Sequence, residues 1–152
     1  MLFQTALAAL ALTYSLPADI QLGASEADNA AALSRLCAQQ TRRELDPAQL
    51  PLAQNQHVQI DCDGYAYMGA PRRAEFVFAD DRLTHVWVLV EADELDALET
   101  AFMSQHGAAS VTTETFSAFF TARTAVRRDI PEALYYSEEA APLFEAFFSS
   151  GG

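Results

Sequence analysis

The segment from Leu83 to Val90 (LTHVWVLV) restricts the fold more than any other part of the sequence. Alternate residues of a β-strand point to opposite faces of a sheet, and here both faces are apolar. One face would carry Leu83, Trp87 and Leu89, and the other Val86, Val88 and Val90. A strand of this kind lies inside a sheet that has a packing layer on each side.

The neighbouring segments predict more antiparallel strands. Residues Ala74 to Ala79 form a hairpin with the central strand, and the hairpin's tip is Asp80-Asp81-Arg82. The run His57 to Cys62 alternates, and Tyr65 to Gly69 continues this strand or pairs with it. Three later segments are also expected as strands, namely residues 116–122, 124–128 and 132–136.

Three segments carry the apolar spacing and end signals of helices. Ser25 and the acidic residues after it suit a helix start, and Arg42, Arg43 and Asp46-Pro47 suit its end. The expected helices are residues 26–45, 91–106 and 137–148. The resulting order predicts an α+β fold, with a single antiparallel sheet of about five to six strands and helices packed mainly on one face.

The N-terminal residues Leu2 to Leu16 form an almost uncharged run that is shorter than the roughly 20 residues of a membrane-spanning helix. Pro17 ends the run, and Gly23-Ala24-Ser25 offers the small residues that signal peptidase reads. We therefore expect a signal peptide at residues 1–25 and one domain at residues 26–152. The alternative is that the run is a first buried element of the domain.

The chain has two cysteines, Cys37 and Cys62, and no Cys-x-x-Cys motif. In an exported protein such a pair predicts a disulfide, whereas in the cytosol it would be two buried thiols. No second Cys/His pair has zinc spacing. The sequence therefore predicts one Cys37–Cys62 disulfide and a periplasmic or secreted bacterial protein.

The charge balance excludes some classes of partner. The 152 residues carry a formal net charge of −12, from 21 acidic residues against nine arginines, and the chain has no lysine. Nucleic acid binding requires clustered cationic side chains, and anionic membranes attract the same groups. We therefore expect neither a nucleic acid partner nor stable membrane insertion after cleavage of the signal peptide.

The middle of the chain resembles a known group of proteins. Residues 30–110 contain a helix, a strand with a cysteine, the turn Gly69-Ala70-Pro71, the hairpin Glu75 to Leu83 and a helix that ends at Gly107. This order resembles small periplasmic α/β modules of the outer-membrane-assembly lipoprotein and β-lactamase-inhibitor-like kind. The resemblance implies a module that binds proteins and does no chemistry. It gives no functional residue, and the missing lipobox leaves membrane anchoring open.

Several charged groups are candidates for a catalytic, metal or anion site. His85 with Asp80 and Asp81 could do general acid–base work or line a small-ligand cleft, as in a minor hydrolase, but no nucleophile motif accompanies them. Asp61-Cys62-Asp63-Gly64 departs from a calcium loop because its glycine comes fourth. The pairs Arg72-Arg73 and Arg127-Arg128 form an anion site only if the fold joins them. We expect no cofactor, no metal and no catalytic residue.

The aromatic residues of the predicted strands cannot all enter one core, because alternation divides them between two sheet faces. Tyr and Trp are common anchors of protein interfaces. The expected binding surface consists of Trp87, His85, Tyr65, Tyr67, Phe119 and Tyr135. The leading hypothesis is a non-catalytic module that binds an envelope or secreted protein through this surface. A homodimer or a covering N-terminal segment would bury the same face instead.

Overall fold

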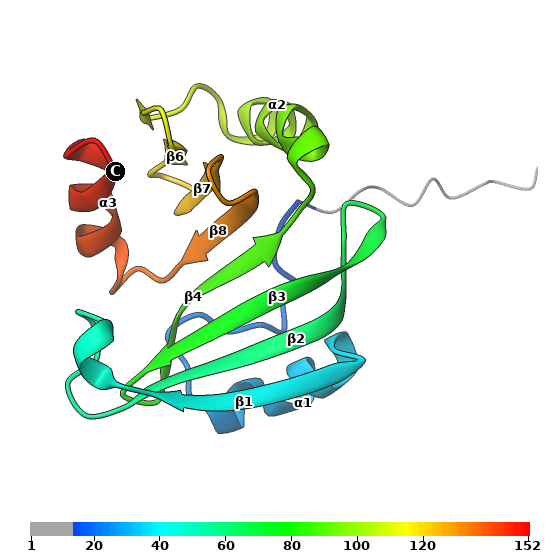
Figure 1. The fold of residues 1–152 in the computed structure, drawn as a ribbon, viewed down its shortest axis with the longest axis vertical. Coiled ribbons are helices and arrows are strands. Elements are labelled where there is room, and N and C mark those ends of the chain that lie inside the picture. Colours follow the sequence, from blue (N-terminus) through cyan, green and yellow to red (C-terminus); the bar gives the residue numbers. More distant parts are fainter. Residues whose placement is uncertain (1–13) are drawn as a thin grey trace, which may run out of the picture.

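The fold is one eight-stranded antiparallel sheet with three short helices, in a computed structural model that describes residues 14–152 (Figure 1). The strand order is β1-β2-β3-β4-β8-β7-β6-β5. The strands are β1 (Gln39–Leu45), β2 (His57–Tyr67), β3 (Ala70–Ala79), β4 (Arg82–Leu89), β5 (Val111–Thr112), β6 (Phe116–Phe119), β7 (Thr124–Arg127) and β8 (Glu132–Tyr136). The helices are α1 (Glu26–Leu36), α2 (Leu95–His106) and α3 (Ala141–Ser149), with 3-10 turns η1 (Pro47–Gln49) and η2 (Ala92–Glu94).

The predicted count of five to six strands was wrong, because β1 and β5 were missed. Residues 39–45 were expected to continue the first helix, but α1 ends at Leu36 and the chain turns to an extended conformation at Cys37. Strand β1 then pairs along its whole length with β2. Six of its seven residues are exposed, so this edge strand lacks the apolar alternation that identifies most strands. Strand β5 has only two residues.

The disulfide was predicted correctly: Cys37 at the end of α1 is bonded to Cys62 of β2. Cys62 is fully buried and belongs to the larger core. The bond therefore fixes the end of α1 to the sheet at the point where the chain enters β1.

The larger core lies on the face of the sheet that we call the first face. It contains Leu33 of α1, Leu98 and Phe102 of α2, Ile20 of the preceding segment, and the inward residues of β2, β3 and β4. Residues 23 and 24 also join the sheet region, since Gly23 N–H donates to the Leu83 carbonyl and Leu83 N–H to the Ala24 carbonyl, both at 2.8 Å. Residues 1–13, which include most of the predicted signal segment, lie outside the described part of the chain.

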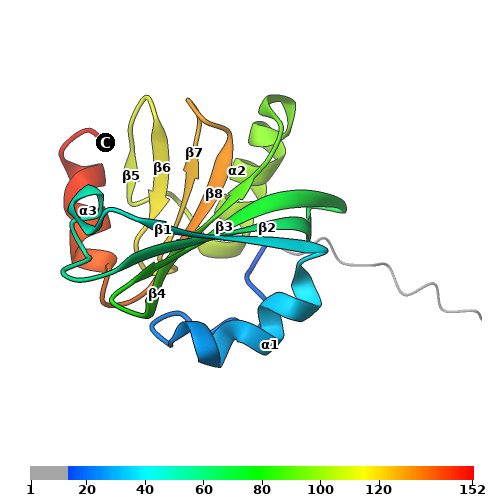
Figure 2. The same ribbon diagram turned by 60° about the horizontal axis from the view of Figure 1, so that its bottom comes forward.

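The smaller core lies on the opposite, second face, where α3 packs on β8, β7 and β6. Figure 2 shows α1 beneath β1–β4, and α3 and α2 on opposite sides of the strands β5–β8. The second-face core consists of Phe116, Ala118, Ala125, Leu134, Tyr136, Ala140 and Phe148. Helices therefore cover both faces, which corrects the expectation that they pack mainly on one face.

Two β-bulges change which face several side chains reach. Between Val77 and Phe78 of β3 the register skips Thr84 of β4, so Leu83 joins Val86 on the first face. A second irregularity lies between Asp63 and Tyr65 of β2, at Gly64. Gly64 has a φ of +81°, and a Cβ on it would lie 2.8 Å from the Cβ of Ala38, so this position requires glycine.

The last two helices begin later than the sequence indicated. The predicted helix 91–106 opens with η2 and becomes α-helical only at Leu95. The predicted helix 137–148 starts at Ala141, because Ser137 instead accepts a hydrogen bond from the Ala140 N–H at 3.1 Å in a turn before the helix. Across residues 14–152, no helix has the length and apolar character needed to cross a membrane.

Candidate functional site

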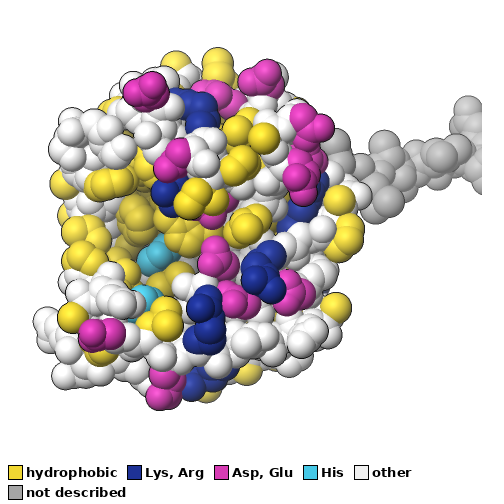
Figure 3. All heavy atoms as spheres, in the orientation of Figure 1, with side chains coloured by type: hydrophobic (Ala, Val, Ile, Leu, Met, Phe, Trp, Pro, Cys, Tyr) yellow, Lys and Arg dark blue, Asp and Glu magenta, His cyan; other side chains and the backbone are white. Residues whose placement is uncertain are grey.

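A cleft of about 440 Å³ lies on the second face, between α3, the loop at residues 50–52 and strands β4 and β7. We call it the second-face groove. Figure 3 shows it as a hollow of hydrophobic side chains with histidine in it, next to a surface of mixed charge. Its lining comprises Leu50, Pro51, Leu52, His85, Trp87, Thr115, Phe116, Arg127, Asp129, Leu143, Phe144, Phe147, Phe148 and Gly152.

Aromatic rings from the sheet and from α3 meet in the groove. Alternation along β4 places His85 and Trp87 on the second face, and their ring centroids lie 6.0 Å apart with perpendicular planes. Phe144 of α3 packs edge-on against His85 at 5.0 Å and stacks on Tyr136 at 5.1 Å. Such arrangements favour the binding of further apolar or aromatic groups.

His85 is held neutral in this environment. It is only 5% exposed, and its Nδ1 lies 2.9 Å from the Thr84 hydroxyl. The Thr84 hydroxyl donates to the Val77 carbonyl at 3.1 Å. Burial, assisted by the charge of His57, lowers the pKa of His85 to about 3. The imidazole is therefore a neutral hydrogen-bonding group at any physiological pH.

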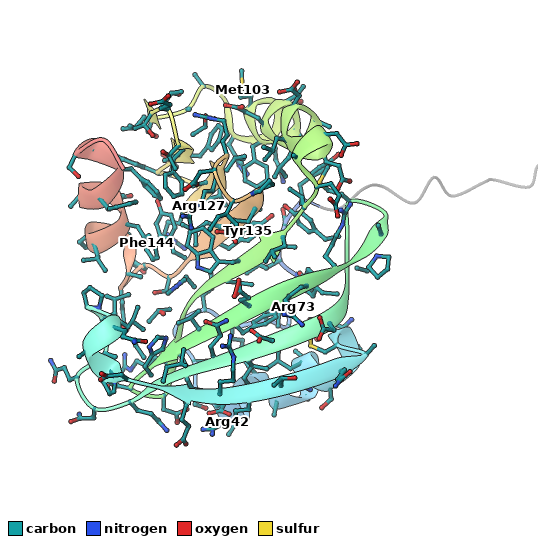
Figure 4. All side chains as sticks on the ribbon, viewed as in Figure 1. Arg42, Arg73, Met103, Arg127, Tyr135 and Phe144 are labelled. Carbon is teal, nitrogen blue, oxygen red and sulfur yellow. A yellow bond between two sulfur atoms is a disulfide. The ribbon has the colours of Figure 1, made fainter. Side chains whose placement is uncertain are left out.

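Arg127 lies at the edge of the groove, beside the aromatic rings. Its guanidinium carbon is 5.8 Å from the Trp87 ring centroid and 5.7 Å from that of Phe116, distances at which cations attract aromatic faces. The same group pairs with Asp129 at 2.7 Å and with Glu132 at 3.1 Å. Figure 4 shows Arg127 from β7 and Phe144 from α3 beside the same space.

Glu132 is an unusual member of this group because it is only 4% exposed. Burial raises its pKa to about 7, and the nearby Arg127 opposes this shift without cancelling it. The carboxylate of Asp129, on the outer side of Arg127, behaves in the opposite way, because its hydrogen bond from Arg127 lowers its pKa. Arg127 therefore joins one buried and one exposed carboxylate at the groove.

Four of the six residues expected on a binding surface lie instead in the first-face core: Tyr65, Tyr67, Phe119 and Tyr135. The bulge at Gly64 moves Tyr65 and Tyr67 to the face of Cys62, which uninterrupted alternation would not do. The hydroxyls of Tyr67 and Tyr135 bond to each other at 2.5 Å, and that of Tyr135 also donates to the Tyr14 carbonyl. Of the six, His85 and Trp87 line the second-face groove.

Asp80 and Asp81 do not join His85. Both have positive φ at the tip of the β3–β4 hairpin. Asp80 accepts backbone hydrogen bonds from the N–H groups of Gln54, Asn55 and Gln56, which lower its pKa. Asp81 accepts from the Glu26 N–H at 3.0 Å. These aspartates hold a loop and a helix start, and neither lines the groove.

The other charged motifs also form local pairs. Asp61 pairs with Arg43 and Asp63 with Arg73, and within residues 14–152 no cluster of three potential ligands suits a metal ion. The two arginine pairs remain separate. Arg72 bonds to Glu94, and Arg73 bonds to Asp63. Arg127 bonds to Asp129 and Glu132, and Arg128 bonds to Glu99.

Most residues of the groove lining were not predicted from the sequence. The expected helix at residues 137–148 carried no assignment for Phe144, Phe147 or Phe148, and residues 50–52 have no periodicity that would place them in the fold. One signal was available: the run Pro142-Leu-Phe-Glu-Ala-Phe-Phe148 is too apolar for a nine-residue helix with one buried face. Phe147 is in fact 48% exposed.

No family model, curated protein or solved structure matches this chain.

Proposed function

We propose that this protein is a non-catalytic binding module and that its second-face groove takes up a small, largely apolar molecule. The observation that carries the proposal is a cleft that is lined by the rings of Trp87, Phe144 and Phe147 and also contains a neutral histidine, His85. Small-molecule sites in proteins are clefts of roughly 300 to 1,000 Å³, with mostly apolar linings and a few polar groups that orient the ligand. The groove fits that description in volume and in lining.

A protein partner is the second candidate. Phe147 and Leu143 of α3 are 48% and 39% exposed, and both line the groove. Exposed apolar residues beside a cleft favour the insertion of a partner's side chain. In this version the partner is another envelope or secreted protein, or a second copy of this chain.

Export to an oxidising compartment also remains part of the proposal. The Cys37–Cys62 disulfide supports it, because structural disulfides persist in the periplasm and outside the cell. Intact mass measurement of the protein from its native cells would reveal whether a signal segment has been removed.

The test of groove binding uses the single tryptophan of the chain, Trp87. Indole is titrated into ¹⁵N-labelled protein, and the side-chain N–H resonance of Trp87 is followed by NMR. We expect this resonance to shift and to saturate. Phe147→Ala should weaken the binding severalfold, because it removes an exposed ring from the groove lining.

Met103→Ala is the matched control, since Met103 is 50% exposed on α2 and does not line the groove. Equal binding by both variants would contradict a site at the groove. A sedimentation mass that changes from dimer to monomer in Phe147→Ala would instead identify a second copy of the chain as the occupant.

A further inference from the structure

The hydrogen bonds of His85 determine which of its two ring nitrogens carries the proton. The Thr84 hydroxyl has one proton, and its oxygen lies 3.1 Å from the Val77 carbonyl oxygen and 2.9 Å from Nδ1 of His85. Both contacts are hydrogen bonds at once only if the hydroxyl donates to the carbonyl and Nδ1 carries the imidazole proton, which it donates to the Thr84 oxygen. In a neutral imidazole the other nitrogen, Nε2, is then a hydrogen-bond acceptor.

Nε2 of His85 has no hydrogen-bond partner among residues 14–152. Within the same residues, the fully buried side-chain polar atoms without a partner are the hydroxyl oxygens of Thr124 and Tyr136. Nε2 also lacks a partner but is not among these fully buried atoms, so it is not fully buried. Because the His85 ring lines the groove, this nitrogen is accessible from the groove. An almost fully buried side chain thus presents one unused acceptor to an apolar cleft.

We propose that Nε2 of His85 accepts a hydrogen bond from the ligand, and that the groove therefore selects neutral aromatic molecules with an O–H or N–H donor, such as phenols and indoles. This inference rests on the proposed function. Trp87 and Phe144 pack edge-on against the His85 ring and line the same groove, so a flat ligand that contacts either ring lies beside His85. A carboxylate at this position is disfavoured, because two acceptors would face each other.

The immobility of the ring supports this role. Thr84 is buried, and its hydroxyl is fixed by the Val77 carbonyl within the β3–β4 bulge. The low pKa of His85 means that acidification does not convert Nε2 into a donor above about pH 4. The acceptor is therefore positioned before the ligand enters, which reduces the ordering cost of binding.

The experiment compares indole with 1-methylindole, which has the same ring system but no N–H. We expect wild-type protein to bind indole about twofold to tenfold more tightly, the range given by one net hydrogen bond. His85→Phe keeps an aromatic ring but removes the acceptor, so it should bind both ligands with similar affinity. Thr84→Val should reduce the preference, because it frees the proton of the imidazole to move to Nε2.

A direct measurement in the wild-type protein avoids dependence on the folding of these variants. Long-range ¹H–¹⁵N spectra should give an unprotonated Nε2 in the free protein, and its resonance should move on addition of indole but not of 1-methylindole. Equal affinities of the wild-type protein for the two ligands, with Trp87 shifting for both, would overturn the role of His85 and leave groove binding intact. If neither indole nor 1-methylindole shifts the Trp87 resonance, the groove itself is overturned as a binding site.

Discussion

Both faces of the sheet carry aromatic side chains but use them differently. On the first face, α1, α2 and the segment before α1 cover the strands, and the rings of Tyr65, Tyr67 and Phe102 are at most 2% exposed. On the second face, α3 has only nine residues and covers part of the sheet, so Trp87 and His85 line a cleft. Alternation along a strand distributes the aromatic residues, and the covering layer decides whether they form a core or a site.

The strongest test of this contrast compares a phenylalanine from each face. Phe102→Ala removes a fully buried ring that contacts Phe119 and Tyr135, and we expect it to lower the free energy of unfolding by about 3 to 5 kcal/mol. Phe147→Ala removes a ring that is 48% exposed, and the expected loss is about 1 kcal/mol or less. Chemical denaturation measures both.

Ligand binding should follow the reverse order. Phe102→Ala, at a temperature where it remains folded, should bind indole as the wild-type protein does, whereas Phe147→Ala should bind it more weakly. Comparable losses of stability in the two variants would mean that the second face is as fully packed as the first.

The disulfide gives the next largest effect and belongs to the first face alone. It closes a loop between positions 25 residues apart, and the chain-entropy model gives about 3 kcal/mol of stabilisation for such a loop. The Cys37→Ala/Cys62→Ala double variant should lose this amount in chemical denaturation. Indole affinity should be unchanged, since neither cysteine lines the groove. A weakened groove after loss of the disulfide would indicate that the two faces are coupled.

The sequence predicted the core strands well because their apolar alternation reflects burial directly. Residues 57–62, 74–79 and 132–136 lie in β2, β3 and β8, and the correct pairing of Cys37 with Cys62 was predicted because the chain has only these two cysteines. Strand β1 could not be recognised, since its stability comes from hydrogen bonds to β2 and its residues are polar. A pattern of side chains gives no information about a strand that buries none of them.

The positions of the expected surface residues could not be predicted for a different reason. The extra residues at Gly64 and Thr84 each reverse the alternation between the residues before and after them, so a period of two cannot place Tyr65 or Leu83 on the correct face. The groove also needs α3 and the loop at residues 50–52, which are far apart in sequence. His85 and Trp87 were placed together because they are two residues apart on one uninterrupted stretch of β4.

The smallest expected effect concerns Glu132, where the second face buries a carboxyl group beside the groove. Its pKa is raised from 4.5 to about 7, chiefly by burial, and the folded state therefore binds more protons than the unfolded state between these pH values. Stability contributed by Glu132 is full below pH 4.5 and is lost as the pH rises through about 7.

Glu132→Gln should therefore stabilise the protein at pH 8 and have little effect at pH 4. The pKa shift, which already includes the opposing effect of Arg127, sets an upper bound of about 3 kcal/mol, and the cost of burying the Gln amide reduces the expected gain to about 1 to 2 kcal/mol. Asp129→Asn is the matched control on the same arginine. Its carboxyl pKa is lowered, so Asp129 stabilises the fold above its unfolded pKa, and the variant should lose stability at pH 8.

Denaturation of the three proteins at pH 4 and pH 8 measures these opposite signs. If Glu132→Gln and Asp129→Asn change stability in the same direction at pH 8, Glu132 is as solvated as Asp129, and the groove edge at Arg127 is open to water. Opposite directions would mean that the sheet beside the groove excludes water even where α3 leaves it uncovered. The carboxyl group of Glu132 would then already be free of water before a ligand enters the groove. The ligand could form its hydrogen bond to His85 without displacing tightly held water from Glu132.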